Sequence, residues 1–377
     1  MNILVNALGI SSAGGITVLR KLIEEVVHAK DHRFYVFLFV NKNTVSLKED
    51  FSQHSHIQYI FIKNRGLIFR IIYENSFFIF FSRKNKISLI YNFSGTSQII
   101  PNTKQLIKVQ NLLFYSRKLD RQYFKSNNYI SWIRQILIKR IIFIIMLKFN
   151  KFIEVQSNHV SSHLESFINL SSKTLFVKSD SLPAAGSIKN PNNYDFSKKL
   201  TFLFIVGPHF HLPHKNIKDF VEAMVLLDKN KVDYEIQITL TKSELESSNL
   251  WNDLLDKNTK FLGYLPSPQI HNLFTDNTVL ISTSIIETIG LHVLEATLSG
   301  CLTITPQEKY SKSVYGDNVL TYKIFDPNSL YARIKNIYTL SKDEINHIII
   351  NNQKYIVKNE ESKESNILQV FKKIICN

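Results

Sequence analysis

The feature of this sequence that most constrains its fold is an alternation of strand and helix patterns that occurs twice. In the first half, short runs rich in β-branched and aromatic residues alternate with longer helical patterns such as residues 16–29 and 130–147. The alternation restarts after residues 182–196, a stretch rich in proline, glycine, asparagine and serine that is the best linker in the chain. Strands that alternate with helices are typical of βαβ units and mainly parallel sheets.

We therefore expect an α/β fold of two doubly wound, Rossmann-like domains that face a central crevice, where ligands bind at the carboxyl ends of the strands. The expected domains are residues 1–185 and 186–357, followed by a C-terminal helix, 358–377, that can cross back to the first domain. The predicted strands are 2–7, 34–40, 57–62, 87–91, 106–109, 152–155, 202–206, 234–239, 260–263, 279–282 and 302–305. The predicted helices of the second half are 217–227, 244–255, 267–274, 291–298, 328–340 and 342–375.

Composition excludes several classes of protein. The 377 residues are 44% hydrophobic and 20% charged, which allows a large core and excludes wholesale disorder. Cys301 and Cys376 are the only cysteines and cannot form a disulfide framework. The N-terminal run 2–8 lacks a preceding basic region and indicates a strand rather than a signal peptide. The most apolar stretch, 136–149, is too short and too charged to span a membrane. Because the cysteine usage does not indicate an oxidising compartment, we expect a cytoplasmic protein.

The basic charge of the chain is confined to one part of it. The formal net charge is +15, yet residues 181–377 contain equal numbers of basic and acidic residues. Residues 63–151 contain 17 Lys and Arg but only two acidic residues, Glu74 and Asp120. Such an asymmetry predicts contact with a nucleic acid, a membrane surface or an anionic ligand.

The most informative segment is 279–300, VLISTSIIETIGLHVLEATLSG. An apolar strand ends near Ser284, a loop carries Glu287, and a helix begins near Gly290 and carries Glu295. A glycine at a helix entry lets a ligand approach the backbone, and the free amides of the first turn favour phosphate. Two carboxylates eight residues apart can bind hydroxyl groups on both sides of that phosphate, as a nucleotide sugar requires. Two glutamates at this spacing alone also fit a solvated helix and a favourable acid near its N-terminus.

The run S-x-x-E-T-I-G-L-H-V-L-E-A-x-x-S-G at 284–300 resembles the E-x7-E signature of retaining glycosyltransferases of family 4, which have the GT-B fold. Gly14-Gly15 follows the first strand at the mouth of a helix, as in that family. Residues 207–216 stand where the family has a basic phosphate-binding loop, and 261–265, FLGYL, are similar to its F-x-G-x-L strand near the nucleobase. The resemblance covers essentially the whole chain and is strong over 202–335.

The resemblance implies roles for the matching residues. Glu287 matches the glutamate that contacts the donor sugar, Glu295 the one that holds the ribose, and Lys215 the lysine on the diphosphate. Glu287 and Lys215 are therefore the catalytic candidates. The predicted donor-binding residues are Gly14, Gly15, Gly207, His209, Lys215, Leu262, Gly263, Tyr264, Ser284, Glu287, Thr288, Ile289, Gly290, Leu291 and Glu295. No cofactor and no metal are expected, because enzymes that this chain resembles need no bound metal.

Histidines occur at two places where this sequence departs from the family pattern. Pro208-His209 stand where an arginine is common, and His292 stands where a proline is frequent. His209, His211 and His214 also allow a metal site, but no carboxylate or cysteine accompanies them. A loop that faces phosphate, or a merely solvated loop, is the favoured interpretation.

The N-terminal half is expected to supply the acceptor site and a membrane contact. Ser94 and Asn111 follow predicted strands and are candidates for binding acceptor hydroxyls, although either also fits a turn cap. Residues 130–149 mix aliphatic side chains with cations, as interfacial helices do, but a buried helix whose cations reach solvent is the favoured interpretation of this segment by itself. The surrounding charge, 63–151, favours an anionic membrane surface on the inner face of the cell membrane.

We therefore predict a retaining, metal-independent glycosyltransferase. It would move a sugar from a nucleotide-sugar donor to a glycan or lipid-linked glycan, in surface polysaccharide biosynthesis such as that of O-antigen. One alternative is a nucleotide-sugar 2-epimerase of the same fold. A second is a non-enzymatic protein that binds nucleic acid or carbohydrate, although no recognisable nucleic-acid module occurs in the sequence.

Overall fold

The computed structural model describes residues 1–29, 33–51, 53–63, 66–178, 180, 188–207, 209–364 and 366–376. Two compact units make up the chain. The first comprises 1–116, 127–181 and 361–377, and the second 117–126 and 182–360. The predicted boundary at 185/186 and the first part of the predicted linker, 182–187, lie outside the described residues.

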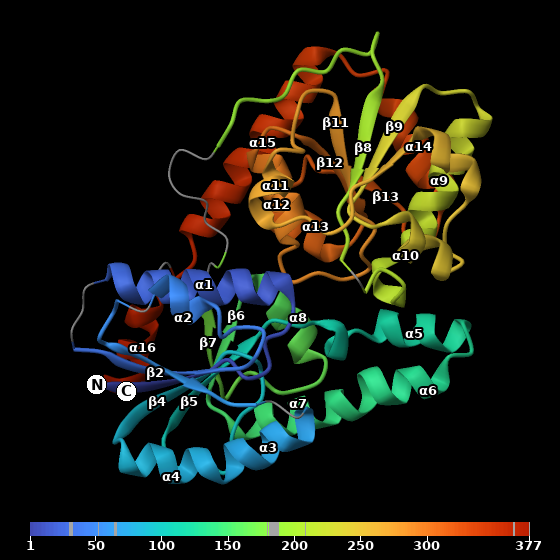
Figure 1. Ribbon diagram of the computed structural model, residues 1–377. Coiled ribbons are helices and arrows are strands. Elements are labelled where there is room, and N and C mark those ends of the chain that lie inside the picture. Colours follow the sequence, from blue (N-terminus) through green and yellow to red (C-terminus); the bar gives the residue numbers. More distant parts are fainter. Residues whose placement is uncertain are drawn as a thin grey trace. The chain divides into compact units, whose positions relative to one another are not determined.

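A seven-stranded parallel sheet, ordered β3-β2-β1-β4-β5-β6-β7, forms the centre of the first unit (Figure 1). In the register of this sheet, Ile3 of β1 pairs with Val36 and with Leu89, and all three side chains are buried. Its strands are β1 (Asn2–Asn6), β2 (Tyr35–Val40), β3 (Ile57–Phe61), β4 (Ile87–Asn92), β5 (Lys104–Val109), β6 (Phe152–Val155) and β7 (Thr174–Val177). The short strand β7 is the one that the sequence patterns did not predict.

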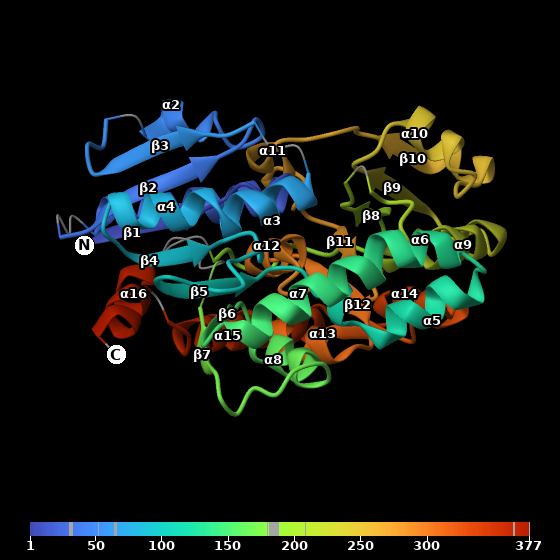
Figure 2. The ribbon, with the colours of Figure 1, turned by 90° about the horizontal axis from the view of Figure 1, so that it is seen from below.

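Helices cover both faces of this sheet, with α1 on one face and α3, α4 and α7 on the other (Figures 1 and 2). Helix α1 begins at Ala13 because the Ser12 hydroxyl accepts a hydrogen bond from the Gly15 amide at 3.2 Å. The predicted helix 130–147 contains a π-helical turn, 133–137, between α6 and α7. The helices are α1 (Ala13–His28), α2 (Leu47–Phe51), α3 (Leu67–Asn75), α4 (Phe77–Lys84), α6 (Tyr129–Trp132), α7 (Ile138–Phe149), α8 (Asn158–Glu165) and α16 (Ile367–Cys376).

A six-stranded parallel sheet, ordered β10-β9-β8-β11-β12-β13, forms the centre of the second unit. Its strands are β8 (Leu200–Phe204), β9 (Tyr234–Ile238), β10 (Thr259–Phe261), β11 (Thr278–Ile281), β12 (Leu302–Pro306) and β13 (Leu320–Tyr322). Its helices are α5 (Arg117–Lys125), α9 (Ile217–Lys229), α10 (Lys242–Ser247), α11 (Ser267–His271), α12 (Leu291–Leu298), α13 (Lys309–Tyr315), α14 (Pro327–Ile337) and α15 (Lys342–Glu361). Helices α9 and α14 pack on one face, and α12 and α13 on the other (Figure 1).

The predicted α/β class with two doubly wound parallel sheets is confirmed. In each sheet the first strand lies between the second and the fourth, so both sheets reverse direction beside their first strand. This reversal is the topological switch point, where ligands of open α/β sheets bind at the strand carboxyl ends. The switch points lie between β1 and β4 in the first unit and between β8 and β11 in the second.

Several predicted elements differ from those observed. The predicted helix 244–255 is wrong, because α10 ends at Ser247 and a separate 3-10 helix covers 253–258. Asn249, at a φ of 55°, lies in the left-handed region and interrupts the helical backbone between them. The predicted helix 342–375 is two helices, and its second part, α16, belongs to the first unit.

One segment of the N-terminal half clusters with the second unit. The segment is 117–126, which contains α5 and which the predicted boundaries placed in the first domain. Lys118 of α5 forms an ion pair with Glu308, and its Nζ lies 5.8 Å from the centroid of the Phe325 ring.

Among the described residues, every helix is too short or too polar to cross a bilayer.

Candidate active site

The best-defined polar site lies at the switch point of the second sheet. The chain leaves β8, passes through a 3-10 turn at Pro213–Lys215 and enters α9. It leaves β11 through residues 282–290 and enters α12. Because β8 and β11 are parallel neighbours, their carboxyl ends meet, and the two following loops lie side by side.

Lys215 and Glu287 form an ion pair across these two loops. Lys215 Nζ donates a hydrogen bond to Glu287 Oε1 at 2.9 Å and to Ser284 Oγ at 3.4 Å. The two charged side chains are only 26% and 18% exposed. Burial alone would raise the pKa of Glu287, but the charges of Lys215 and His292 and the hydrogen bonds from Lys215 and Ser284 lower it to about 2. Glu287 is therefore ionised at neutral pH and accepts hydrogen bonds rather than donating a proton.

Backbone and hydroxyl contacts fix the loops that carry this pair. Thr283 Oγ1 donates to the carbonyl of Lys215 at 2.7 Å, and the Ile285 amide donates to the carbonyl of His214 at 2.8 Å. Tyr310 Oη donates to the carbonyl of Ser284 at 2.5 Å. These contacts connect the β8 loop to the β11 loop, so Lys215 and Glu287 are held by structure around them and not only by each other.

Gly290 directly precedes α12, at its N-cap, and admits no other residue without strain. Its φ of 53° and ψ of 63° lie in the left-handed region. A Cβ atom on Gly290 would lie 2.1 Å from Tyr315 Oη, a buried hydroxyl with no hydrogen-bond partner among the described residues. The first amides of a helix have no intrahelical acceptor, so the N-terminus of α12 offers donors beside Glu287.

The other predicted donor-binding residues lie on the same and on neighbouring loops. Glu295 is half-buried on α12, and Ile289 is buried directly before Gly290. Thr288 and Leu291 are partly exposed beside them, and Gly207 and His209 are exposed in the loop after β8. Leu262, Gly263 and Tyr264 follow β10, where the Leu262 amide donates to the Ile238 carbonyl at 2.8 Å, Gly263 has a φ of 66°, and Tyr264 is 76% exposed.

Predicted residues of the N-terminal half belong to the first unit. Gly14 and Gly15 lie in the first turn of α1. Asn111 is exposed, and its Oδ1 accepts a hydrogen bond from the Leu113 amide at 2.9 Å. This contact caps a turn, which is the alternative role that the sequence allowed for Asn111. Ser94 follows β4, and its Oγ is buried with no hydrogen-bond partner among the described residues.

The three histidines of the β8 loop are not grouped around one position. His209 and His211 are exposed with ring centroids 6.4 Å apart, whereas His214 is buried. Within the described ranges, no three His, Cys, Asp or Glu side chains are grouped to hold a metal ion. A pocket beside this loop is lined by Phe210, His211, Glu244, Ser247 and Ser248.

Sequence reasoning missed two side chains of this site. His292, treated only as a departure, lies in the first turn of α12, where its Nε2 is 3.3 Å from Ser282 Oγ and its charge acts on Glu287. Tyr315 lies over Gly290 and comes from α13, an element that the sequence patterns did not predict. His292 stands three residues before Glu295 in the sequence, and this position was the available signal that it belongs to the site.

Cys301 is buried, and burial raises the pKa of its thiol to about 12, as expected of a core residue.

We expect the second unit to lose stability in mild acid. Burial lowers the pKa of His214 and of His292 to about 4, so the unfolded chain takes up protons below about pH 6.5 that the folded chain does not. Stability is therefore fully present above pH 6.5 and falls as the pH drops toward 4, by about 2 kcal/mol for each histidine at pH 5. Urea unfolding at pH 7.5 and 5 measures this loss. His292→Gln should lose less stability than wild type, and equal losses would contradict the assignment.

Comparisons with known proteins agree with this geometry. Residues 189–360 match the family model described as "Glycosyl transferases group 1". Lys215, Glu287 and Glu295 all lie within the matched residues. No curated protein matches the sequence.

Solved structures match the whole chain. Sucrose-phosphate synthase from Thermosynechococcus elongatus is 14% identical with a TM-score of 0.69, over 100% of this chain and 99% of that one. Anabaena HepE, in complex with UDP and glucose, is 13% identical with a TM-score of 0.63, over 99% and 100%. WaaG, a glycosyltransferase involved in lipopolysaccharide biosynthesis, is 11% identical with a TM-score of 0.62, over 96% and 98%. These likenesses confirm the GT-B fold.

Proposed function

We propose that this protein is a retaining, metal-independent glycosyltransferase of family 4. The observation that carries the proposal is the Lys215–Glu287 pair beside the N-terminus of α12, at the switch point of the second sheet. The pair lies inside the residues that match the group 1 family model, which supports a nucleotide sugar as the donor. The UDP and glucose bound by HepE support the same substrate class.

In the proposed reaction the nucleoside diphosphate leaves while the sugar moves to an acceptor hydroxyl. Lys215 and the first amides of α12 stabilise the negative charge that develops on the diphosphate. Glu287, ionised because of Lys215, accepts hydrogen bonds from the hydroxyls of the donor sugar, and Glu295 accepts them from the ribose. Neither glutamate needs to be a nucleophile, because the acceptor can attack from the face that the diphosphate leaves. The proposal includes no metal and no cofactor.

We propose a glycan or lipid-linked glycan acceptor and a role in surface polysaccharide biosynthesis. The fold that this chain shares with WaaG, which acts in lipopolysaccharide biosynthesis, supports that role. The basic stretch 63–151 supports a site of action at the inner face of the cell membrane.

The test is product analysis with a panel of nucleotide sugars. We expect release of the nucleoside diphosphate to depend on an added glycan acceptor, and the new linkage to keep the anomeric configuration of the donor, as read by NMR. Inverted linkages would exclude a retaining enzyme. Conversion of the nucleotide sugar to its 2-epimer without acceptor would favour the epimerase alternative.

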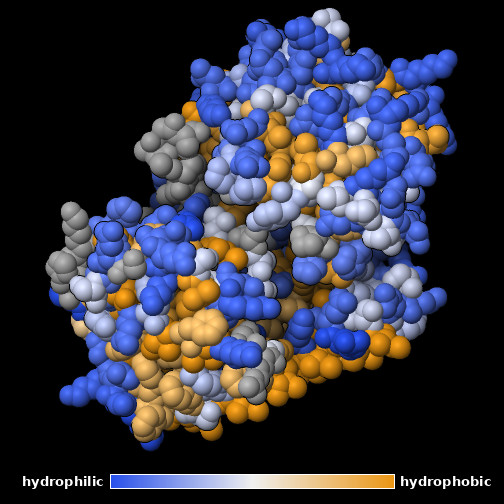
Figure 3. All heavy atoms as spheres, in the orientation of Figure 1, coloured by the Kyte–Doolittle hydropathy of each residue, from blue (hydrophilic) through white to orange (hydrophobic). Residues whose placement is uncertain are grey.

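Exposed apolar side chains support the membrane part of the proposal. Apolar residues gather along the edge of the first unit formed by α4, α3, α7 and α6 (Figures 1 and 3). The two acidic residues of the basic stretch, Glu74 and Asp120, are buried, so its exposed charges are cations such as Arg83, Lys84 and Lys148. The side chains of this apolar face are between 40% and 75% exposed, and they belong to Ile68, Ile72, Phe80, Ile130, Ile138, Ile141, Ile145 and Phe149.

We expect the protein to bind vesicles that contain phosphatidylglycerol, and to bind less tightly as salt is raised. The triple variant Ile72→Ser, Phe80→Ser, Ile141→Ser should bind at least about tenfold more weakly, because inserted apolar side chains contribute more than 1 kcal/mol each. Leu254→Ser, which removes an apolar side chain 56% exposed in the second unit, is the control. Equal sedimentation of the triple variant and wild type with such vesicles would contradict a membrane contact through this face.

A further inference from the structure

Arg70, on α3 of the first unit, is a cation without a counter-ion in contact. Its side chain belongs to a residue only 8% exposed, and among the described residues its guanidinium forms no hydrogen bond and no ion pair. Burial lowers its pKa, and the charge of Glu74 only partly offsets that effect. A buried charge without a partner destabilises the folded state by several kcal/mol, roughly, so its presence indicates a function such as binding.

The Arg70 guanidinium lies at the switch point of the first sheet. Gly9 follows β1 and Ser94 follows β4, and these two strands are parallel neighbours. A Cβ atom on Gly9 would lie 1.4 Å from Arg70 Nη1 and 2.7 Å from Ser94 Cβ. The guanidinium therefore rests on the backbone of Gly9, at the strand ends where ligands of such sheets bind.

A second cation, Lys139 of α7, lies close to this position. Lys139 Nζ is 5.9 Å from the centroid of the Phe114 ring, which stacks on Phe143 with centroids 5.0 Å apart. Phe143 in turn lies 3.0 Å from where a Cβ on Gly95 would be. Burial and the charge of Arg70 lower the pKa of Lys139, so the two cations act on each other.

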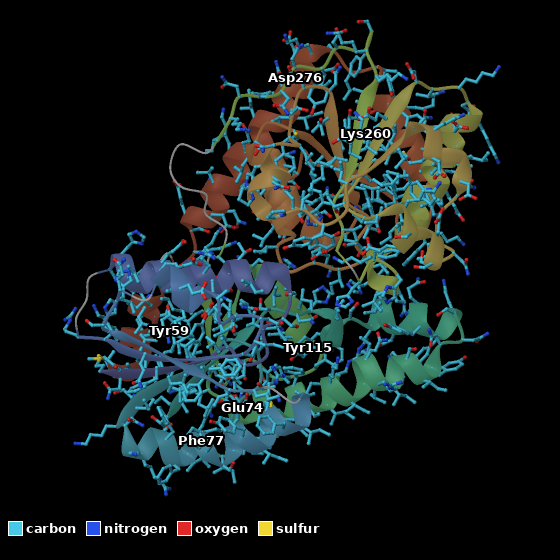
Figure 4. All side chains as sticks on the ribbon, viewed as in Figure 1. Tyr59, Glu74, Phe77, Tyr115, Lys260 and Asp276 are labelled. Atoms are coloured by element: carbon cyan, nitrogen blue, oxygen red, sulfur yellow. The ribbon has the colours of Figure 1, made fainter. Side chains whose placement is uncertain are left out.

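Polar atoms at the same strand ends are also unsatisfied. Ser94 Oγ, after β4, and Gln110 Nε2, after β5, are buried and have no hydrogen-bond partner among the described residues. The carboxylate on α3 belongs to Glu74, which Figure 4 labels in the first unit. Its Oε1 accepts hydrogen bonds from Asn6 at 2.7 Å and from Thr96 at 2.6 Å, whereas its Oε2 is buried with no hydrogen-bond partner among the described residues. The strand ends thus present two cations, a hydroxyl and an amide nitrogen that all can donate hydrogen bonds.

We propose that Arg70, Ser94, Gln110 and Lys139, here named the switch-point cluster, bind a phosphate or diphosphate group of the acceptor. A phosphate offers several acceptor oxygens, and the planar guanidinium of arginine binds it in a bidentate manner. This inference rests on the proposed function, because it gives the acceptor its chemical class. The charged group of a lipid diphosphate and that of a soluble sugar phosphate have the same chemistry.

Calorimetric titration with inorganic pyrophosphate tests the cluster. The titrations use full-length protein that carries Lys215→Ala, so that the proposed donor site does not compete for the probe. We expect Arg70→Gln and Lys139→Gln each to weaken pyrophosphate binding at least about tenfold, which is 1.4 kcal/mol. Lys48→Gln, which removes an exposed cation on α2, should bind pyrophosphate unchanged. Farnesyl diphosphate that binds more tightly than pyrophosphate would identify a lipid source, and equal affinity a soluble one.

Thermal unfolding without ligand separates a binding role from a structural one. Because it removes an uncompensated charge, Arg70→Gln should unfold at the same temperature as the parent or higher. Unchanged pyrophosphate affinity in Arg70→Gln, or a lower unfolding temperature together with no binding in the parent, would overturn the inference. Nucleotide-sugar binding to wild type is measured beside it. If that binding is seen while the cluster fails its test, only the inference is lost, and if no nucleotide sugar binds, the proposed function itself is lost.

Discussion

Replacing Lys215 with alanine is expected to lower kcat/KM for sugar transfer by about 10²- to 10³-fold, because in the proposed reaction Lys215 stabilises the charge on the leaving diphosphate. Glu287→Gln should lower transfer by a similar factor, because it removes the charge that pairs with Lys215 and that, in the proposed reaction, accepts hydrogen bonds from the donor sugar. Transfer from a radiolabelled nucleotide sugar at subsaturating donor measures both effects.

The matched control for this experiment is Lys218→Ala. Lys218 lies three residues further on, in α9, where its side chain is 72% exposed and pairs with Glu222 at 3.6 Å. Its loss should leave transfer within about twofold, because exposed i,i+4 pairs contribute a few tenths of a kcal/mol. If Lys215→Ala and Glu287→Gln both retained the turnover of Lys218→Ala, the assigned site would be wrong.

Gly290→Ala is expected to destabilise the protein by about 2–5 kcal/mol and to weaken nucleotide-sugar binding. Placing alanine in the left-handed region costs about 1–2 kcal/mol by itself. The added methyl group must also displace Tyr315, whose Oη lies 2.1 Å from the new atom, and overpacking of this kind costs a further 1–3 kcal/mol, roughly. Urea unfolding measures the change.

A double-mutant cycle separates the two parts of this effect. Tyr315→Phe alone should be almost neutral, because its buried hydroxyl has no hydrogen-bond partner among the described residues. Combined with Gly290→Ala, it should recover the part of the loss due to the contact with the hydroxyl and leave the backbone part. Additive losses in the double variant would show that Tyr315 does not restrict position 290.

Strand pattern and spacing predicted much of this molecule. Apolar runs bounded by turn residues located β1, β8 and β11, whose carboxyl ends position the candidate sites. Glu287, Gly290 and Lys215 stood in motifs whose order along the chain matched a known family, and the structure brings Lys215 and Glu287 together. Their contact follows from the pairing of β8 with β11, which the strand order of a doubly wound sheet implies.

Other features depend on tertiary contacts that no local pattern encodes. The short strand β13 and helix α13, which carries Tyr315, lack a clear apolar period of their own. Residues 342–375 have one helical pattern, yet the chain breaks it between α15 and α16. Arg70 looked like one more cation of a basic stretch, because only the fold places its guanidinium on Gly9 at the end of β1.

The most direct measurement of the central claim is calorimetric titration of wild type, Lys215→Ala and Glu287→Ala with a panel of nucleotide sugars. We expect at least one nucleotide sugar to bind wild type, and to bind each variant at least about tenfold more weakly, a difference of 1.4 kcal/mol. A nucleotide sugar that bound all three proteins with equal affinity would contradict the site. A panel in which none bound, beside nucleic-acid binding that falls steeply with salt, would contradict the glycosyltransferase itself.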